Sequence, residues 1–186
     1  MVVEARPAGA ETGERVSEEE PPKHILRENA RLRQELAHLR VLQAERRRVA
    51  QALASAGFVA GGLQGTGQLI WPVIGPLSSP FGQRWGRLHA GIDISAAGGT
   101  PIRAADSGQV VLAGSQGGYG LYTCVQHSER LSTCYAHQSR LGTAPGAAVR
   151  KGQVIGFVGN TGHSFGNHLH FETWVDGRPV DPLGFL

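Results

Sequence analysis

The chain lacks any apolar run that approaches the roughly 18 residues needed to cross a membrane. Its first residues also lack a basic segment followed by an apolar one, so no standard signal peptide is visible in the chain. Cysteine is scarce, with two residues in 186, and their spacing does not suit a four-cysteine zinc site. The sequence therefore predicts no transmembrane segment.

Large apolar residues are almost missing from residues 1–22, which hold six Glu and two Arg. Such a segment cannot bury enough surface to offset its ordering entropy, so we expect it to be disordered.

Glycine and proline are absent from residues 23–56, where eight Lys or Arg accompany three Glu. This segment carries a charge of +5 and so accounts for the basic net charge of +3 of the whole chain, which argues against a nucleic-acid partner for the rest of the chain. The basic segment is either a solvated helix face or a surface that favours an anionic membrane or cell-wall polymer.

Residues 23–56 carry the periodicity of a helix. Apolar residues and one asparagine recur at alternating spacings of four and three, which is typical of a coiled-coil seam: Ile25, Asn29, Leu32, Leu36 and Leu39. The same seam continues with Gln43 and Arg46, so the pattern decays after Leu39. We expect a helix or short coiled coil that self-associates or pairs with a partner helix, or a lone helix that packs on the domain.

The remainder of the chain reads as a flexible linker followed by a β domain. Residues 57–67 are rich in glycine, as expected for a linker. Residues 68–186 contain short segments rich in Val, Ile, Tyr and Phe, separated by Gly, Pro, Asn and Ser. No amphipathic helix of normal length follows residue 60. This pattern predicts an all-β domain of sandwich or barrel-like form.

The two cysteines lie in the stretch YTCVQHSERLSTCYAH, whose flanks alternate as strands do around a turn. If residue 127 pairs with 131, Cys124 lies opposite Cys134, and a cross-strand disulfide is geometrically possible. A disulfide would indicate an oxidising compartment. The alternative is a pair of reduced, buried thiols.

The segment GNHLHFE places His168 and His170 two residues apart. In a strand both imidazoles point to the same face, and burying them is costly unless they bind something. They offer two metal ligands, or one ligand and one proton-transfer group. His89 and Asp93 would share a face of another extended segment. With one histidine of the pair they make a two-His, one-carboxylate set that suits zinc with an open fourth position.

Several ordered motifs resemble the lysostaphin/LytM family of zinc endopeptidases. The motifs are WPVIGPLSSPFGQRWGRLHAGIDI, STCYAH, KGQVIGFVGNTG and GNHLHFE, and the resemblance covers about residues 69–186. It implies a mostly antiparallel β-sheet domain, like a duplicated hybrid motif, with one zinc ion in a groove. It also implies that the enzyme cuts peptide bonds of bacterial peptidoglycan.

The resemblance assigns roles residue by residue. It implies that His89, Asp93 and His170 are the zinc ligands and that His137 and His168 are the catalytic pair. Further candidates for substrate binding are Arg84, Tyr135 and His163, with Trp85 and Tyr119 as weaker candidates for groove walls. Latent members use an upstream asparagine as a fourth ligand, and no clear equivalent precedes His89. Glu172 lies too far along the strand to assign.

Two functions stay open at this stage. The complete ligand set favours a zinc endopeptidase that acts on peptidoglycan stems or cross-bridges. The alternative is a silent coiled-coil regulator that activates other cell-wall hydrolases, although such relatives tend to lose zinc ligands. Either function implies an extracytoplasmic location. The bond cut, the oligomeric state, the export route and the general base of the pair are not decided by the sequence.

Overall fold

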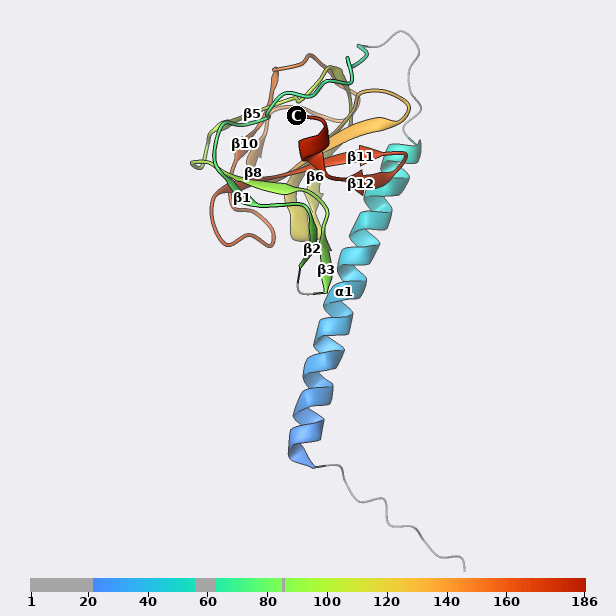
Figure 1. Ribbon diagram of the computed structural model, residues 1–186, viewed down its shortest axis with the longest axis vertical. Coiled ribbons are helices and arrows are strands. Elements are labelled where there is room, and N and C mark those ends of the chain that lie inside the picture. The colour runs from blue at the N-terminus through green and yellow to red at the C-terminus, as the bar shows by residue number, and fades with distance from the viewer. Residues whose placement is uncertain (1–21, 56–62, 85) are drawn as a thin grey trace, which may run out of the picture. The chain divides into compact units, whose positions relative to one another are not determined.

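The computed structural model describes residues 22–55, 63–84 and 86–186 (Figure 1). It contains one long helix, α1 (Lys23–Ser55), followed by strands. The helix agrees with the predicted segment 23–56. Most of the segment predicted to be disordered, the first part of the predicted linker and Trp85 lie outside the described residues. None of the helices among the described residues is long and apolar enough to span a membrane.

Twelve strands and two short 3-10 helices follow α1 in the described residues. They are β1 (Leu77–Ser79), β2 (Gly82–Arg84), β3 (Arg87–His89), β4 (Ile92–Ser95), β5 (Pro101–Arg103), β6 (Gly108–Gln116), η1 (Gly117–Tyr119), β7 (Gly120–Gln126), β8 (Leu131–Leu141), β9 (Ala148–Val149), β10 (Val154–Val158), β11 (His168–Val175), β12 (Arg178–Val180) and η2 (Pro182–Gly184).

The strands form one ten-stranded sheet and a separate hairpin of β2 and β3. The main path of the large sheet is β1-β4-β11-β8-β7-β6-β9, and every paired strand is antiparallel. Over the described residues this path does not close into a barrel. The predicted mostly antiparallel β domain behind a helix is therefore confirmed.

The central strands β7, β8 and β11 separate two layers of buried side chains. Along β11, Leu169 and Phe171 face the larger apolar core, whereas Trp174 belongs to a second cluster on the opposite face. This alternation follows from the period of two in an extended strand. His170 and Glu172 alternate with Leu169 and Phe171, so their side chains share the face of Trp174 and the second cluster.

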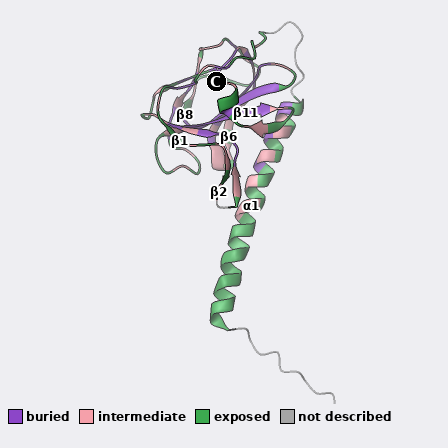
Figure 2. Ribbon diagram, viewed as in Figure 1, coloured by how far each residue is buried: buried purple, intermediate pink, exposed green. Residues whose placement is uncertain are grey.

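The second cluster receives the last turns of α1. Val49 and Leu53 are buried there, together with β-strand residues Tyr122, Cys124, Cys134, Ala136 and Trp174. The contacts divide the chain into two compact units between Leu39 and Arg40, inside α1. Side chains on the first turns of the helix are exposed, and burial begins only beyond residue 37 (Figure 2). The predicted boundary between helix, linker and domain stays a prediction.

The cysteines lie as the sequence predicted. Cys124 on β7 pairs with Cys134 on β8 across the hairpin, and the two form a disulfide with a Cα–Cα distance of 4.1 Å. Both are fully buried in the second cluster. The alternative of two reduced thiols is excluded in this structure.

Candidate metal centre

Three strands bring together the side chains that the sequence proposed as metal ligands. His89 ends β3, Asp93 lies on β4, and His170 lies on β11. Strands β4 and β11 are neighbours in the sheet, and their register pairs Asp93 directly with His170. Because directly opposed residues project from the same face, the carboxylate and the imidazole meet without any loop rearrangement.

The ligand atoms of these residues form a tight triangle. His89 Nε2 lies 3.0 Å from His170 Nδ1 and 3.1 Å from Asp93 Oδ1, and His170 Nδ1 lies 2.8 Å from the same oxygen. In tetrahedral zinc sites with bonds of about 2.0–2.1 Å, neighbouring ligand atoms are about 3.3 Å apart. Both histidines are buried, with His89 7% and His170 6% exposed. The residues present therefore fit a small divalent cation such as zinc, and they form a group that can hold one.

Each ligand imidazole is oriented by its other ring nitrogen. His89 Nδ1 donates to the Pro80 carbonyl oxygen at 2.7 Å, which leaves Nε2 as the lone-pair atom of the triangle. His170 Nε2 donates to Glu172 Oε1 at 3.1 Å, which leaves Nδ1. Such outer hydrogen bonds fix the tautomer and the ring plane of a metal ligand. The two tautomers are thus the ones that metal binding requires.

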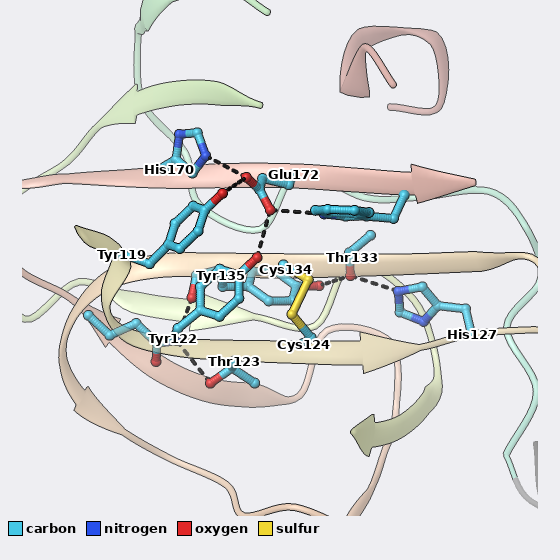
Figure 3. The surroundings of a disulfide bond; sticks show 12 residues. Tyr119, Tyr122, Thr123, Cys124, His127, Thr133, Cys134, Tyr135, His170 and Glu172 are labelled. Atoms are coloured by element: carbon cyan, nitrogen blue, oxygen red, sulfur yellow. Dashed lines mark hydrogen bonds and ion pairs between the residues drawn. A yellow bond between two sulfur atoms is a disulfide. The ribbon is translucent and has the colours of Figure 1, made fainter. Parts of the chain in front are cut away.

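Glu172 is a fully buried carboxylate at the centre of a hydrogen-bond network (Figure 3). Its Oε1 accepts from the Tyr119 hydroxyl at 3.0 Å in addition to His170. Its Oε2 accepts from the Tyr122 hydroxyl at 2.6 Å and from Trp174 Nε1 at 2.9 Å. Four donors thus satisfy a group that would otherwise be costly to bury.

The same network determines the charge of Glu172. Burial alone would raise the pKa of this carboxyl, but the hydrogen bond and charge of His170 and the hydrogen bonds from Tyr122 and Trp174 lower it below its usual value. Glu172 is therefore ionised and accepts from His170. Sequence reasoning left this residue unassigned, although a period of two along HLHFE places residues 168, 170 and 172 on one face. That alternation was the signal that could have found it.

The two proposed catalytic histidines lie next to each other beside the ligands. The ring centroids of His137 and His168 are 4.8 Å apart, and those of His137 and His170 are 6.0 Å apart. His137 Nδ1 donates to the Thr161 carbonyl oxygen at 2.8 Å, and His168 Nδ1 donates to that of Gly166 at 2.9 Å. Each therefore keeps Nε2 as a proton acceptor. His168 Nε2 lies 3.7 Å from Asp93 Oδ1.

A local backbone feature accounts for the direction of His137. Its φ is 58°, in the left-handed region that non-glycine residues rarely adopt. With regular alternation, the side chain of residue 137 would lie on the face opposite Cys134 and Ala136. The His137 ring instead lies beside His170, on the same face as Cys134 and Ala136. Burial and the nearby His170 lower the pKa of His137 to about 4. The imidazole is therefore neutral at neutral pH.

The three predicted substrate-binding residues lie in different surroundings. Arg84 NH2 lies 3.5 Å from Asp93 Oδ2, at the rim of the triangle, and its side chain is 37% exposed. His163 is exposed, and its backbone N–H donates to the Gly118 carbonyl oxygen at 2.8 Å. A substrate role for these two residues stays a prediction. The prediction for Tyr135 is wrong, because its ring is fully buried on Phe171 and its hydroxyl accepts from the Ala105 N–H at 2.8 Å.

The last turns of α1 also reach the surroundings of the site. Arg46 donates to the Leu88 carbonyl oxygen, next to the ligand His89. Glu45 accepts from the Gly118 N–H at 3.0 Å, beside the Tyr119 that donates to Glu172. The sequence marked this part of the helix only as a decayed seam. Its polar residues instead contact the two segments that flank the ligands.

The family model described as Peptidase family M23 matches residues 87–182, which include all three candidate ligand residues and both catalytic candidates. The chain belongs to peptidase family M23. This confirms the suspected resemblance to lysostaphin/LytM-type enzymes.

Two curated relatives of the chain have names that describe different activities. The chain is 47% identical over 114 residues to the DD-carboxypeptidase/endopeptidase Mpg of Neisseria meningitidis serogroup B, covering 58% of the chain and 26% of that protein. It is 36% identical over 122 residues to the murein hydrolase activator EnvC of Escherichia coli, covering 64% of the chain and 29% of that protein. The chain thus spans well under half the length of either relative.

Solved structures of similar proteins share the fold. A Pseudomonas aeruginosa protein assigned to peptidase M23 superposes with a TM-score of 0.64 at 34% identity, covering 75% of this chain and 59% of that one. A zinc-containing peptidase from Vibrio cholerae gives a TM-score of 0.58 at 30% identity, covering 63% and 39%.

Proposed function

We propose that this M23 protein is a zinc endopeptidase that hydrolyses peptide bonds in the stems or cross-bridges of bacterial peptidoglycan. The observation that carries the proposal is the triangle of lone-pair atoms from His89, Asp93 and His170 beside two further histidines. Two imidazoles and one carboxylate match the ligand set of catalytic zinc sites that keep an open position. Membership of a peptidase family and the similarity to Mpg add support.

The roles of the residues follow from their hydrogen bonds. Bound zinc would supply Lewis-acid chemistry at the scissile carbonyl and would acidify a water molecule. His137 and His168 each keep Nε2 as the proton-accepting ring nitrogen, because Nδ1 of each donates to a backbone carbonyl oxygen. One imidazole accepts the proton of the attacking water, and the pair returns a proton to the leaving amine. Glu172 holds the His170 ring in the ligand tautomer.

The proposed site of action is outside the cytoplasm. Peptidoglycan lies there, and the buried Cys124–Cys134 disulfide is of the kind that persists in oxidising compartments. Thiol labelling of protein denatured directly from cells tests this point. We expect both cysteines to be blocked until a reductant is added, whereas two freely labelled thiols would argue for a reducing compartment.

Digestion of purified peptidoglycan, with mass spectrometry of the products, tests the proposed activity. The wild type is expected to release fragments with new amino termini, and both His170→Ala and His137→Ala are expected to release none. His24→Ala, on an exposed turn of α1, is the matched control and should digest at the wild-type rate. An undiminished rate for His170→Ala would overturn the metal assignment.

The similarity to EnvC favours one second candidate, an activator of other cell-wall hydrolases. A helix also precedes the β domain here, in the place where regulators of this kind carry a coiled coil. The same digestion separates the two functions. An activator releases nothing alone and accelerates a purified wall hydrolase, and it should do so equally well as His137→Ala. An endopeptidase works alone and loses its activity in that variant.

A further inference from the structure

The first turns of α1 carry an exposed apolar stripe. Ile25 is 40%, Leu32 48% and Leu36 53% exposed, and with Asn29 and Leu39 they form the seam found in the sequence. Side chains of this size are normally buried, and three on one stripe of a helix indicate an interaction surface. The seam residues recur at spacings of four and three, so they occupy the a and d positions of heptads.

The charges beside this seam are segregated by position. With Asn29 and Leu36 at a, both g positions are acidic, Glu28 and Glu35, and the e positions that follow them are basic, Arg33 and Arg40. In a parallel two-stranded coiled coil, a g residue of one helix lies next to the e residue of the following heptad on the other helix. Glu28 then meets Arg33 of a second copy, and Glu35 meets Arg40 of that copy.

An antiparallel pair of the same helices has the opposite electrostatics. It brings g positions next to g positions and e positions next to e positions, so Glu28 and Glu35 would face glutamates while Arg33 and Arg40 would face arginines. Like charges across an interface destabilise it. The charge pattern therefore selects the parallel orientation for two identical chains.

Asn29 selects the register as well. A single asparagine at an a position pairs with its counterpart in a parallel, in-register dimer, and a shifted register would place it against leucine. Asn29 is exposed in the single chain. The seam residues and the charges on both sides of the seam therefore favour the same partner, a second copy of this chain. We propose that residues 25–40 of α1 form a parallel, in-register two-stranded coiled coil with a second copy of this chain.

The far end of the seam is set by contacts within the chain. Beyond Arg40 the seam continues to Gln43 and Arg46, and Arg46 already donates to the Leu88 carbonyl oxygen. Val49 and Leu53 are buried against the strands of the same unit. The remaining interface is about two heptads long, and isolated helices of that length are marginal. The dimer is therefore expected to dissociate on dilution.

Sedimentation equilibrium of the full chain over a range of concentrations tests the proposal. Wild type should show a monomer–dimer equilibrium. The double variant Glu28→Arg/Glu35→Arg, and separately Arg33→Glu/Arg40→Glu, should raise the dissociation constant at least about tenfold, because each places like charges at every g–e contact. An equimolar mixture of the two variants should dimerise again, since the contacts between them are complementary.

Two controls separate pairing from general charge and from orientation. Arg27→Glu/Arg31→Glu alters the net charge as Arg33→Glu/Arg40→Glu does, but at positions away from the seam, and it should keep the wild-type dissociation constant. Leu36→Cys should form an intermolecular disulfide under mild oxidation, because parallel in-register helices place the two residues 36 together. Ala37→Cys, one residue further on the outer face, should not.

Several results would overturn the proposal. One is a wild-type chain that stays monomeric at the highest soluble concentration, and another is a higher oligomer in place of the dimer. Equal association of wild type and both charge-reversed variants would contradict the assigned g and e contacts. A dimer in which Leu36→Cys does not cross-link would contradict the parallel register. The dimer does not depend on the proposed peptidase activity, so either can fail alone.

Discussion

Two buried polar clusters of this domain contain histidine, and they differ in how many of the ring nitrogens hydrogen-bond to groups outside the cluster's own histidines and carboxylate. In the first, His127 Nδ1 donates to the Ser107 carbonyl oxygen at 2.9 Å, and Nε2 accepts from Thr133 Oγ1 at 2.7 Å. Thr133 in turn lies 2.7 Å from the Tyr135 hydroxyl (Figure 3). The same hydroxyl accepts from the Ala105 N–H. Each side-chain polar atom of His127, Thr133 and Tyr135 therefore has a hydrogen-bond partner.

The second cluster satisfies one nitrogen of each ligand imidazole and leaves the other. His89 donates to Pro80 and His170 donates to Glu172, and the remaining nitrogen of each ring converges with one Asp93 oxygen within 3.1 Å. Converging lone pairs repel unless a proton or a cation lies among them. Burial of a histidine therefore does not by itself indicate a functional site. Convergence of several ligand atoms on one point does.

The largest expected effect comes from removing one of the converging lone pairs. His89→Ala should abolish peptidoglycan digestion and reduce bound zinc to near zero, because two ligands hold zinc far more weakly than three. Metal analysis after dialysis and the digestion assay measure the two effects. Wild-type zinc content in this variant would show that the triangle is not the metal site.

A second effect should separate catalysis from metal binding. His137→Ala should slow digestion about 10²–10⁴-fold, the range for loss of a general acid–base group, while zinc content stays near one per chain. The rate of release of new amino termini gives the first quantity and metal analysis the second. Loss of zinc together with activity would instead make His137 a ligand.

A smaller effect is expected for the carboxylate behind the ligand. Glu172→Gln removes the charged acceptor of His170 and should weaken zinc binding about 10–100-fold, as for other carboxylates that orient a ligand histidine. Competition with a chromophoric chelator measures the affinity. Trp174→Phe removes one donor to Glu172 without touching His170 and should change the affinity much less. Equal losses in both variants would indicate general disruption of the network.

The sequence predicted those parts of the site that depend on strand alternation. The shared face of His168 and His170 and the pairing of Cys124 with Cys134 follow from local period and register, and both could be anticipated. The pairing of His170 with Asp93 joins strands distant in sequence, and only the family resemblance indicated that His170 belongs with Asp93. His137 reaches the site through a left-handed backbone conformation that interrupts alternation, so only the family resemblance indicated its role. The burial of Tyr135 and the contacts of Arg46 depend on packing between segments distant in sequence, which periodicity does not encode.

The smallest effect should come from the satisfied cluster. Burial lowers the pKa of His127 below its ordinary value of 6.5. The unfolded chain therefore takes up this proton first as the pH falls, and the stability supplied by neutral His127 is present above pH 6.5 and is lost progressively below it. His127→Gln should be less stable at pH 7 but should lose less stability on acidification, with zinc binding unchanged. Thermal melts between neutral and mildly acidic pH compare the slopes, and identical slopes would contradict the assignment.

Calorimetric titration of the metal-free chain with zinc is the most direct test of the proposed metal site. The account predicts one site per wild-type chain, no measurable site at that position in His170→Ala, and an unchanged site in His127→Gln. A His170→Ala protein that binds one zinc as tightly as the wild type would contradict it.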